Sequence, residues 1–182
     1  SSQAHNHNDQ GLKYLENLGV KRAVLAREMS LDEIKKLDSK IDKEVFIHGA
    51  LCVSYSGCCL FSSLNGGRSG NRGECVGSCR LPYKLIKNNK VVPLKDKFLL
   101  STKELNTTNN LKDLLASNIT SLKIEGRMKS PSYVGYVTRL YRTLIDKYYN
   151  HEDMSLTKEE ITDLKKLYNR GFTNGYLFNS PD

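Results

Sequence analysis

The sequence predicts an α/β fold in which parallel strands are covered by helices. Short apolar runs that are typical of buried strands alternate along the chain with segments of helical periodicity. A long loop rich in Gly and Ser interrupts this alternation and carries all five cysteines of the chain. A doubly wound sheet and a barrel both satisfy such an order, and 182 residues are enough for one domain with its own core.

The first part of the chain is predicted to alternate helix and strand up to the cysteines. Leucines three residues apart predict the first helix, and Gly19 ends it. A capping box from Ser30 to Glu33 opens the second helix. The expected elements are a helix over 11–18, a strand over 20–26, a helix from residue 31 and a strand over 45–51.

The second part returns to the alternation after the loop. An Asn88-Asn89 pair between two short β-prone runs predicts a hairpin, and Ser130-Pro131 is a typical helix start. The expected elements are a hairpin over 83–94, a strand over 98–101, a helix over 111–117, a strand over 121–124, helices over 131–149 and 158–168, and an extended tail over 171–178. We divide the chain into a part over 1–150, which includes the loop, and a C-terminal helix and tail over 151–182.

The loop over 52–83 places four cysteines in the spacing C-x6-C-x15-C-x3-C, namely Cys52, Cys59, Cys75 and Cys79. Four soft thiolates in one loop are a chelating pattern. Structural zinc usually takes more closely paired cysteines, whereas iron–sulfur clusters accept varied spacing. Disulfides are a third interpretation, although the number of cysteines is odd and no secretory signal is visible. Iron–sulfur and zinc both remain open, and Cys58 is the spare thiol in either case.

The charge of the chain favours an anionic partner. Its net charge is +8, and basic residues gather around the cysteine loop at Arg68, Arg72, Arg80 and Lys84. Such a balance is consistent with RNA binding, although many proteins are equally basic for solubility. No run approaches the ~20 apolar residues of a membrane span, so we expect a cytoplasmic protein without membrane contact. Because the chain opens on Ser, we expect it to be a piece of a longer protein.

A longer motif surrounds the first cysteines. The pattern E-x-F-x-x-G-[SA]-[LIVM]-C-x4-G-x-C-x-[LIVM]-S is matched by Glu44, Phe46, Gly49, Ala50, Leu51, Cys52, Gly57, Cys59 and Ser62. In this motif the chain resembles the collagenase-like peptidase U-32 family, of which the pattern is the signature. The segments RAVLAREMSL, SLKIEGRMKS and NRGFTNGYLF resemble further family blocks, so that the likeness extends over almost the whole chain. Cys58 departs from the pattern, because Arg is common at its position.

The resemblance implies a TIM-like barrel, of which this chain would hold the C-terminal half, since a full barrel needs ~250 residues. It also implies a four-iron four-sulfur cluster held by the four spaced cysteines, hydroxylation of an RNA base without molecular oxygen, and prephenate as the oxygen donor. The isolated piece would then be inactive. Its unpaired sheet edges and uncovered inner face predict self-association.

Two other functions stay open. The family name states a collagenase-like peptidase, but the sequence has no G-x-S-x-G, no H-E-x-x-H and no recognisable Cys–His signature. A zinc-bound, non-catalytic RNA-binding module is the second alternative, since four thiolates also bind zinc.

Candidate catalytic residues follow the predicted strands, where the active sites of barrels lie. Arg27 and Glu28 end one strand, and Glu125 and Arg127 follow another. The two carboxylates could carry protons and the two guanidinium groups could hold an anion, unless all four form an ion-pair network that fixes loops. His48 lies inside its strand, where it is either catalytic or a satisfied core histidine.

Overall fold

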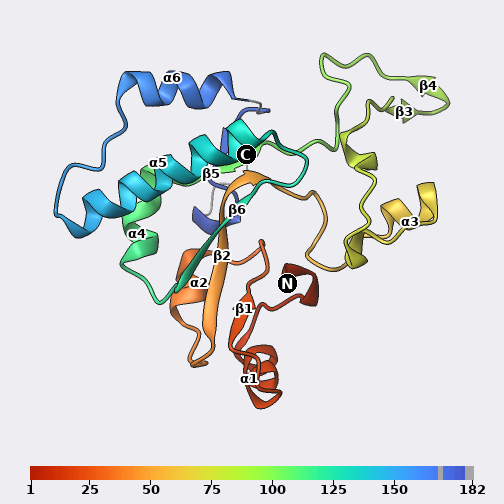
Figure 1. Ribbon diagram of the computed structural model, residues 1–182. Helices are drawn as coiled ribbons and strands as arrows, with labels where there is room; N and C mark the ends of the chain where they lie inside the picture. The colour runs from red at the N-terminus through yellow and green to blue at the C-terminus, as the bar shows by residue number, and fades with distance from the viewer. Residues whose placement is uncertain (168–169, 179–182) are drawn as a thin grey trace.

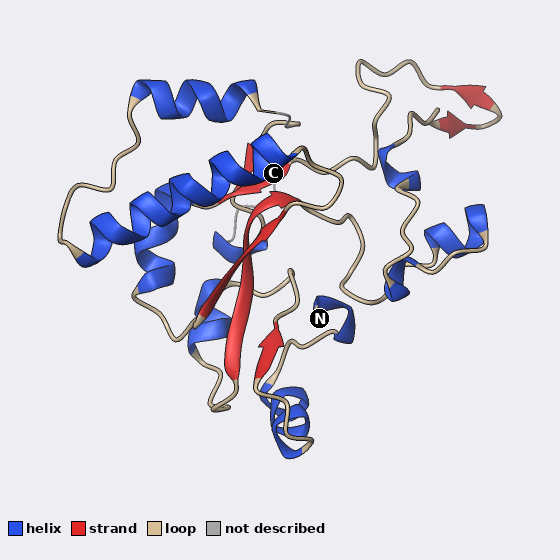
Figure 2. Ribbon diagram, in the orientation of Figure 1, coloured by secondary structure: helices blue, strands red, loops and turns tan. Residues whose placement is uncertain are grey.

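The computed structural model describes residues 1–167 and 170–178. A twisted sheet stands in the middle, with helices on one side of it and the cysteine-rich loop on the other (Figures 1 and 2). The helices are α1 Asp9–Asn17, α2 Leu31–Lys35, α3 Phe61–Gly66, α4 Leu111–Leu115, α5 Pro131–Tyr149 and α6 Lys158–Lys166. The strands are β1 Arg22–Val24, β2 Asp42–Ala50, β3 Ile86–Lys87, β4 Lys90–Val91, β5 Glu104–Asn106, β6 Ser121–Glu125 and β7 Phe172–Thr173.

Strand β2 is the axis of the sheet, because it pairs with three other strands. β1 runs parallel to its first residues along one edge, and β6 runs parallel to it along the other edge. β5 runs antiparallel to β2 and pairs with its last three residues. It lies on the same edge of β2 as β1, which pairs only with the first three residues. β7 then pairs in parallel with β5, and an isolated parallel bridge joins Asn6 to Leu25 beyond β1.

The hydrophobic core lies between the sheet and the helices. Val45 and Ile47 of β2 pack in one cluster with Leu114 of α4 and Val137 of α5, and these side chains are almost fully excluded from water. Burial of each such side chain stabilises the fold by roughly 1.5–3 kcal/mol. Leu177 belongs to the same cluster, so the segment after residue 150 packs into the core of the preceding part.

The face of β2 that points away from the helices is partly polar. Glu44 and Phe46 alternate with the core residues of the strand, and Lys123 of β6 contacts both of them. The Lys123 ammonium lies 3.2 Å from a Glu44 carboxylate oxygen and 5.3 Å from the Phe46 ring centre. We expected an uncovered apolar inner face in a half barrel, and this face is less apolar than that. Self-association stays a prediction.

The local signals for helices are confirmed. Ser30 accepts a hydrogen bond from the Glu33 amide while Glu33 bonds back to the Ser30 amide, which is the predicted capping box. Ser130 caps α5, whose first residue is Pro131, and Thr157 opens α6 with a second capping box. The hairpin is also confirmed, since its two central asparagines adopt the positive φ of a tight turn. The expected end of the last helix at Tyr168 lies outside the described residues.

The predicted strand over 98–101 is wrong. These residues form a turn in which Phe98, Leu99 and Leu100 stay partly exposed, and the strand lies at β5 instead. Glu104 opens that strand and is fully buried. Its ion pairs with Lys129 and Arg170 offset the cost of burying the charge, and the residue type alone does not predict them. Since β5 is antiparallel to β2, the sheet is mixed, and no barrel is closed by the described strands.

The tail is only partly extended, because β7 is followed by a 3-10 turn over 176–178. Within the described residues, no helix combines the length and the apolar character that a bilayer crossing requires.

His48 is a core residue. Its side chain is 1% exposed, its Nδ1 lies 3.2 Å from the Tyr141 hydroxyl, and the rings of Tyr133 and Phe172 surround it. Burial, with a further contribution from the Lys129 ammonium, lowers the pKa of His48 to about 4. The unfolded chain therefore binds a proton between pH ~6.5 and ~4 that the folded chain does not, and stability is lost as the pH falls through this window.

We expect the free energy of unfolding to fall by about 1.4 kcal/mol per pH unit in this window through His48 alone. Urea denaturation between about pH 7.5 and pH 5 would measure it, with His48→Asn as a variant that cannot titrate. The stability difference between the two proteins should shrink as the pH falls. A difference that stays constant over the whole range would contradict the assignment.

Candidate functional site

The cysteine-rich loop leaves the end of β2 and has little apolar core of its own. It contains α3 and two 3-10 turns. Cys79 lies in the second of these turns, and the other cysteines lie on irregular backbone between the elements. Three polar side chains, two from outside the loop and one within it, hold it through hydrogen bonds to backbone groups. The site therefore depends on polar anchors rather than on packing.

Arg80 is the first anchor. Its guanidinium donates hydrogen bonds to the carbonyl oxygens of Leu51 and Thr102 and to the Ser101 hydroxyl. The side chain that follows Cys79 thus holds the residue that precedes Cys52, and this closes the loop at its two ends. Burial lowers the pKa of Arg80, and the neighbouring charge of Arg170 lowers it further. The five N–H donors of the guanidinium group have a fixed geometry that suits several acceptors at once.

Glu28 and Gln3 are the second and third anchors. A Glu28 carboxylate oxygen accepts from the Ser56 amide at 2.6 Å. The Gln3 amide accepts from the Gly57 nitrogen at 2.9 Å and donates to the Gly70 carbonyl at 3.2 Å. Gly57 has φ +76° and passes so close to Gln3 that a Cβ would overlap its backbone oxygen. Only glycine fits this turn of the loop.

All four spaced cysteines line one cavity of about 640 Å³ between the loop and the end of the sheet. Burial raises the pKa of Cys79. The Arg80 charge opposes this shift, and the neighbouring thiols of Cys52, Cys75 and Cys59 add to it. Cys79 is therefore within electrostatic reach of the other three thiols. Two donors already point at the Cys75 sulfur, the Gly77 amide at 3.3 Å and the Ser62 hydroxyl at 3.8 Å.

Cys58 is set apart from this group. It does not line the cavity, and its sulfur lies 4.0 Å from the His5 ring at an exposed position. Within residues 1–167 and 170–178, no three His, Cys, Asp or Glu side chains converge closely enough to hold a single metal ion.

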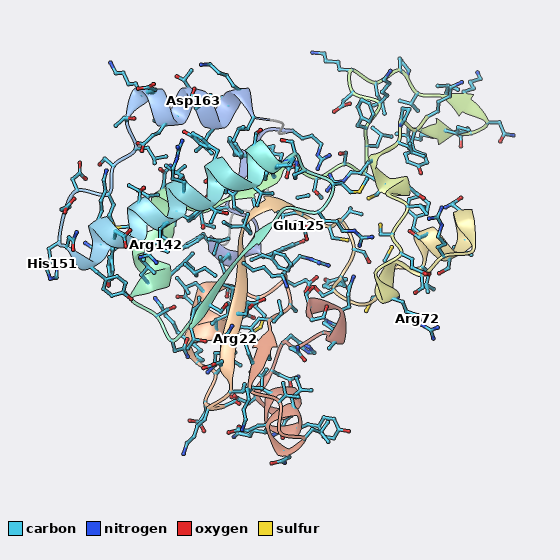
Figure 3. All side chains as sticks on the ribbon, in the orientation of Figure 1. Arg22, Arg72, Glu125, Arg142, His151 and Asp163 are labelled. Atoms are coloured by element: carbon cyan, nitrogen blue, oxygen red, sulfur yellow. The ribbon has the colours of Figure 1, made fainter. Side chains whose placement is uncertain are left out.

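The opposite wall of the cavity comes from the ends of β1 and β6 and from the start of α5. Arg27, Glu125, Arg127, Lys129 and Tyr133 line it. Figure 3 labels Glu125 at the end of β6, on the side that faces the loop. One Glu125 oxygen accepts from the Arg127 amide at 2.7 Å, and this bond fixes the turn after the strand.

Two glycines let the strand ends approach each other at this wall. Gly49 of β2 has φ +105°, and a Cβ there would collide with the Glu125 carbonyl. A Cβ at Gly126 would lie 2.8 Å from the Val134 side chain of α5. A larger residue at Gly49 would displace the backbone of Glu125, and one at Gly126 would press on Val134 of α5.

A buried charge cluster supports the same wall from behind. Glu104 is completely buried and pairs with Lys129 at 3.4 Å and with Arg170 at 2.5 Å. Lys129 and Arg170 also line the cavity, so this cluster brings two cations to its wall and holds them on one buried carboxylate. An unpaired buried carboxylate would be costly, and these pairs remove most of that cost.

Tyr133 adds a buried hydroxyl to this wall. The residue is 4% exposed, and its oxygen has no hydrogen-bond partner among the described residues. The Lys129 ammonium lies 4.9 Å from the centre of its ring. Burial raises the pKa of Tyr133 to about 12, so the hydroxyl is protonated at neutral pH. It is a donor that a ligand in the cavity can use.

The structure brings seven of the nine predicted site residues to one cavity: Cys52, Cys59, Cys75, Cys79, Arg27, Glu125 and Arg127. Glu28 lies on a smaller adjacent cavity and binds the loop backbone, and His48 lies in the core. Lys129, Tyr133 and Arg170 were not among the predicted site residues, although Lys129 lies in the segment SLKIEGRMKS and Arg170 in NRGFTNGYLF.

The role of Glu28 as an anchor can be tested by hydrogen exchange. Glu28→Ala should speed exchange of the Ser56 amide by about tenfold or more, because a hydrogen bond to a charged group stabilises by roughly 1.5–3 kcal/mol. Glu28→Gln keeps an acceptor and should have a smaller effect. Glu125→Ala is the matched control, since its carboxylate accepts from the Arg127 amide outside the loop. Equal exchange at Ser56 in all variants would rule out the anchor.

Comparison with known proteins agrees with the motifs of the sequence. The chain is 39% identical to "tRNA hydroxylation protein P" of Helicobacter pylori strain J99, over 100% of this chain and 46% of the relative. It is 46% identical to "23S rRNA 5-hydroxycytidine C2501 synthase" of Escherichia coli K12, over 74% of this chain and 21% of the relative. A "Collagenase" of Porphyromonas gingivalis strain W83 is 31% identical, over 84% of this chain and 41% of the relative.

The chain thus spans less than half the length of each of these three relatives. No solved structure shows significant similarity to it. The model of peptidase family U32 matches residues 1–182. Because this match covers the whole chain, the protein belongs to peptidase family U32.

Proposed function

We propose that this chain is part of an iron–sulfur-dependent enzyme that hydroxylates a base in tRNA or rRNA without molecular oxygen. The observation that carries the proposal is the shared cavity, in which four thiols face a wall of cations and one protonated hydroxyl. The names of two relatives, a tRNA hydroxylation protein and an rRNA hydroxycytidine synthase, support the substrate class. An RNA substrate would place the reaction in the cytoplasm.

The donor set fits a four-iron four-sulfur cluster. Each cysteine of such a cluster binds a different iron, so the four sulfurs surround a volume and need not meet at one point. Thiols that line one cavity, without three ligands close enough for a single ion, are consistent with this demand. Hydrogen bonds to the Cys75 sulfur are of the kind that tunes such clusters. Cys52, Cys59, Cys75 and Cys79 would hold the cluster, which would supply redox and Lewis-acid chemistry.

The opposite wall supports a role in binding an anionic co-substrate, and we propose prephenate. Arg27 and Arg127 carry planar guanidinium groups that can bind carboxylates bidentately. The Tyr133 hydroxyl can donate to a further oxygen of the same molecule. Glu125 is the carboxylate on this wall that can take up or release a proton.

We further propose that the sheet belongs to a TIM-like barrel. The Asn6 segment, β1, β2 and β6 lie side by side in chain order and run parallel, as consecutive barrel strands do. The remaining strands would come from the rest of the longer protein, and without them the exposed edges would favour self-association and an inactive state.

The peptidase named by one relative has less support in the site. A Cys–His peptidase needs its pair inside a substrate cleft, with the base oriented by a third group. The Cys58–His5 pair lies at the surface, outside the cavity that the other cysteines line. A zinc-bound, non-catalytic module is less favoured because two of the relatives are named for RNA hydroxylation, which such a module would not perform.

The cysteine assignment predicts the metal content of the whole protein. Prepared without oxygen, it should hold roughly four iron and four sulfide per chain. Cys79→Ala should lose most of both, because the cluster loses one of its four ligands. Cys58→Ala is the matched control and should keep the wild-type content. Stoichiometric zinc without iron would refute the cluster, and equal losses in both variants would refute the ligand set.

Tyr133 predicts a selective effect on the acid co-substrate. Tyr133→Phe removes one hydroxyl and should raise the KM for prephenate about tenfold, the equivalent of one hydrogen bond worth about 1.4 kcal/mol. The KM for tRNA should stay unchanged. Tyr136→Phe is the matched control on the same helix, since its hydroxyl donates to the Glu160 carbonyl. If the two variants behaved alike, Tyr133 would have no part in binding.

A further inference from the structure

The hairpin after the cysteine loop forms an arm that extends away from the body of the molecule (Figure 1). We call residues 83–97 the basic arm. A hydrogen bond of 2.7 Å from the Tyr83 amide to the Lys97 carbonyl closes its base, and strands β3 and β4 pair near its tip. Apart from this root, the arm adds no residue to the hydrophobic core. The fold therefore does not explain its composition.

The arm concentrates positive charge. Its residues include Lys84, Lys87, Lys90, Lys95 and Lys97 against the single acidic residue Asp96, which gives +4 of the +8 carried by the whole chain. All five lysines are exposed. None of them forms a salt bridge within residues 1–167 and 170–178. Half of the net charge thus stands unneutralised on a segment of 15 residues.

The charges at the tip of the arm destabilise its hairpin. Lys87 lies directly opposite Lys90 in the register of the hairpin, and like charges in that position destabilise a strand pair. Each strand has only two residues, and an isolated two-stranded hairpin is marginal in water. An anion that sits between the two ammonium groups would remove the repulsion, so the arrangement is one that a polyanion stabilises.

The root of the arm is fixed to the rim of the cysteine cavity. Tyr83 donates to the Ser78 carbonyl at 2.8 Å, and its ring stacks on Phe61 at 6.1 Å between centres. Ser78 and Phe61 both line the cavity. A nucleic acid bound along the arm would therefore pass the mouth of the cavity, where one base could leave its stack and enter.

We propose that the basic arm binds the phosphate backbone of the RNA substrate and holds it beside the cavity. This inference rests on the proposed function. The arm offers ammonium groups without aromatic rings at its tip, which suits sequence-independent contacts to phosphates rather than reading of bases. The exposed Ile86 and Val91 side chains could instead contact the remainder of the longer protein, but they leave the opposed lysines unexplained.

The test compares two pairs of substitutions in the whole protein. Lys87→Gln with Lys90→Gln removes two charges from the tip. Lys21→Gln with Lys40→Gln removes two exposed lysines near the starts of β1 and β2, at the other end of the molecule. The dissociation constant of an unmodified tRNA transcript is measured at several salt concentrations, and thermal unfolding is followed in parallel.

We expect the tip pair to weaken binding roughly tenfold at physiological salt and to lower the slope of log K against log salt by about 1.5, because each lost phosphate contact removes about 0.7–0.9. The other pair should keep the wild-type slope, and both should unfold as the wild type does. Equal slopes and affinities for the two pairs would overturn the proposal, and this is the outcome expected if the arm contacts protein instead.

Base hydroxylation by the wild type is assayed separately. A wild type that binds tRNA but leaves it unmodified would defeat the proposed function, while the salt slopes would still decide the role of the arm. A wild type that hydroxylates RNA, with no change of slope in the tip variant, would defeat the arm alone.

Discussion

The candidate site depends on a small set of hydrogen bonds that hold the backbone of a polar loop against the ends of a sheet. The loop has too few apolar side chains to fold around a core of its own, and its conformation is therefore set by polar anchors. Glu28 and Gln3 bind its backbone from other parts of the chain. Arg80 lies within the loop and binds the backbone carbonyls of Leu51 and Thr102, which flank it in space. Because backbone groups are the same in every residue, such anchors fix the path of the loop and leave its side chains free to line the cavity.

Charge is distributed around this loop in an ordered way. The thiols lie on one side of the cavity, and the cations Arg27, Arg127 and Lys129 lie on the other. If the cysteines bind a cluster as thiolates and an anion binds beside them, as we propose, these cations would offset the repulsion between the two. Buried Glu104 pairs with Lys129 and Arg170 and so fixes the position of these two long side chains at the cavity wall.

The local signals of the chain were sufficient for most elements and for seven of the residues that line the cavity. Capping boxes, the proline at the start of α5 and the asparagine turn act over a few residues, so each could be recognised without knowledge of the fold. The four cysteines could be grouped by their spacing, and Arg27, Glu125 and Arg127 by their position after predicted strands. The prediction of a strand over 98–101 is wrong because we assumed that these apolar residues are buried. The strand β5 begins instead at a charged residue, Glu104, whose partners come from distant segments.

What local signals left open was decided by contacts between residues that are far apart in the chain. Two interpretations of Glu28 and His48 fitted the sequence equally well. The packed chain places Glu28 on the loop backbone and His48 beside Tyr141, 93 positions away. Long-range packing also places Tyr133 and Arg170 at the cavity wall. Helix periodicity and charge predict which side of an element a residue occupies, but they do not predict what lies opposite that side. Short-range sequence therefore named the elements and the thiols, and long-range packing chose which polar groups face them.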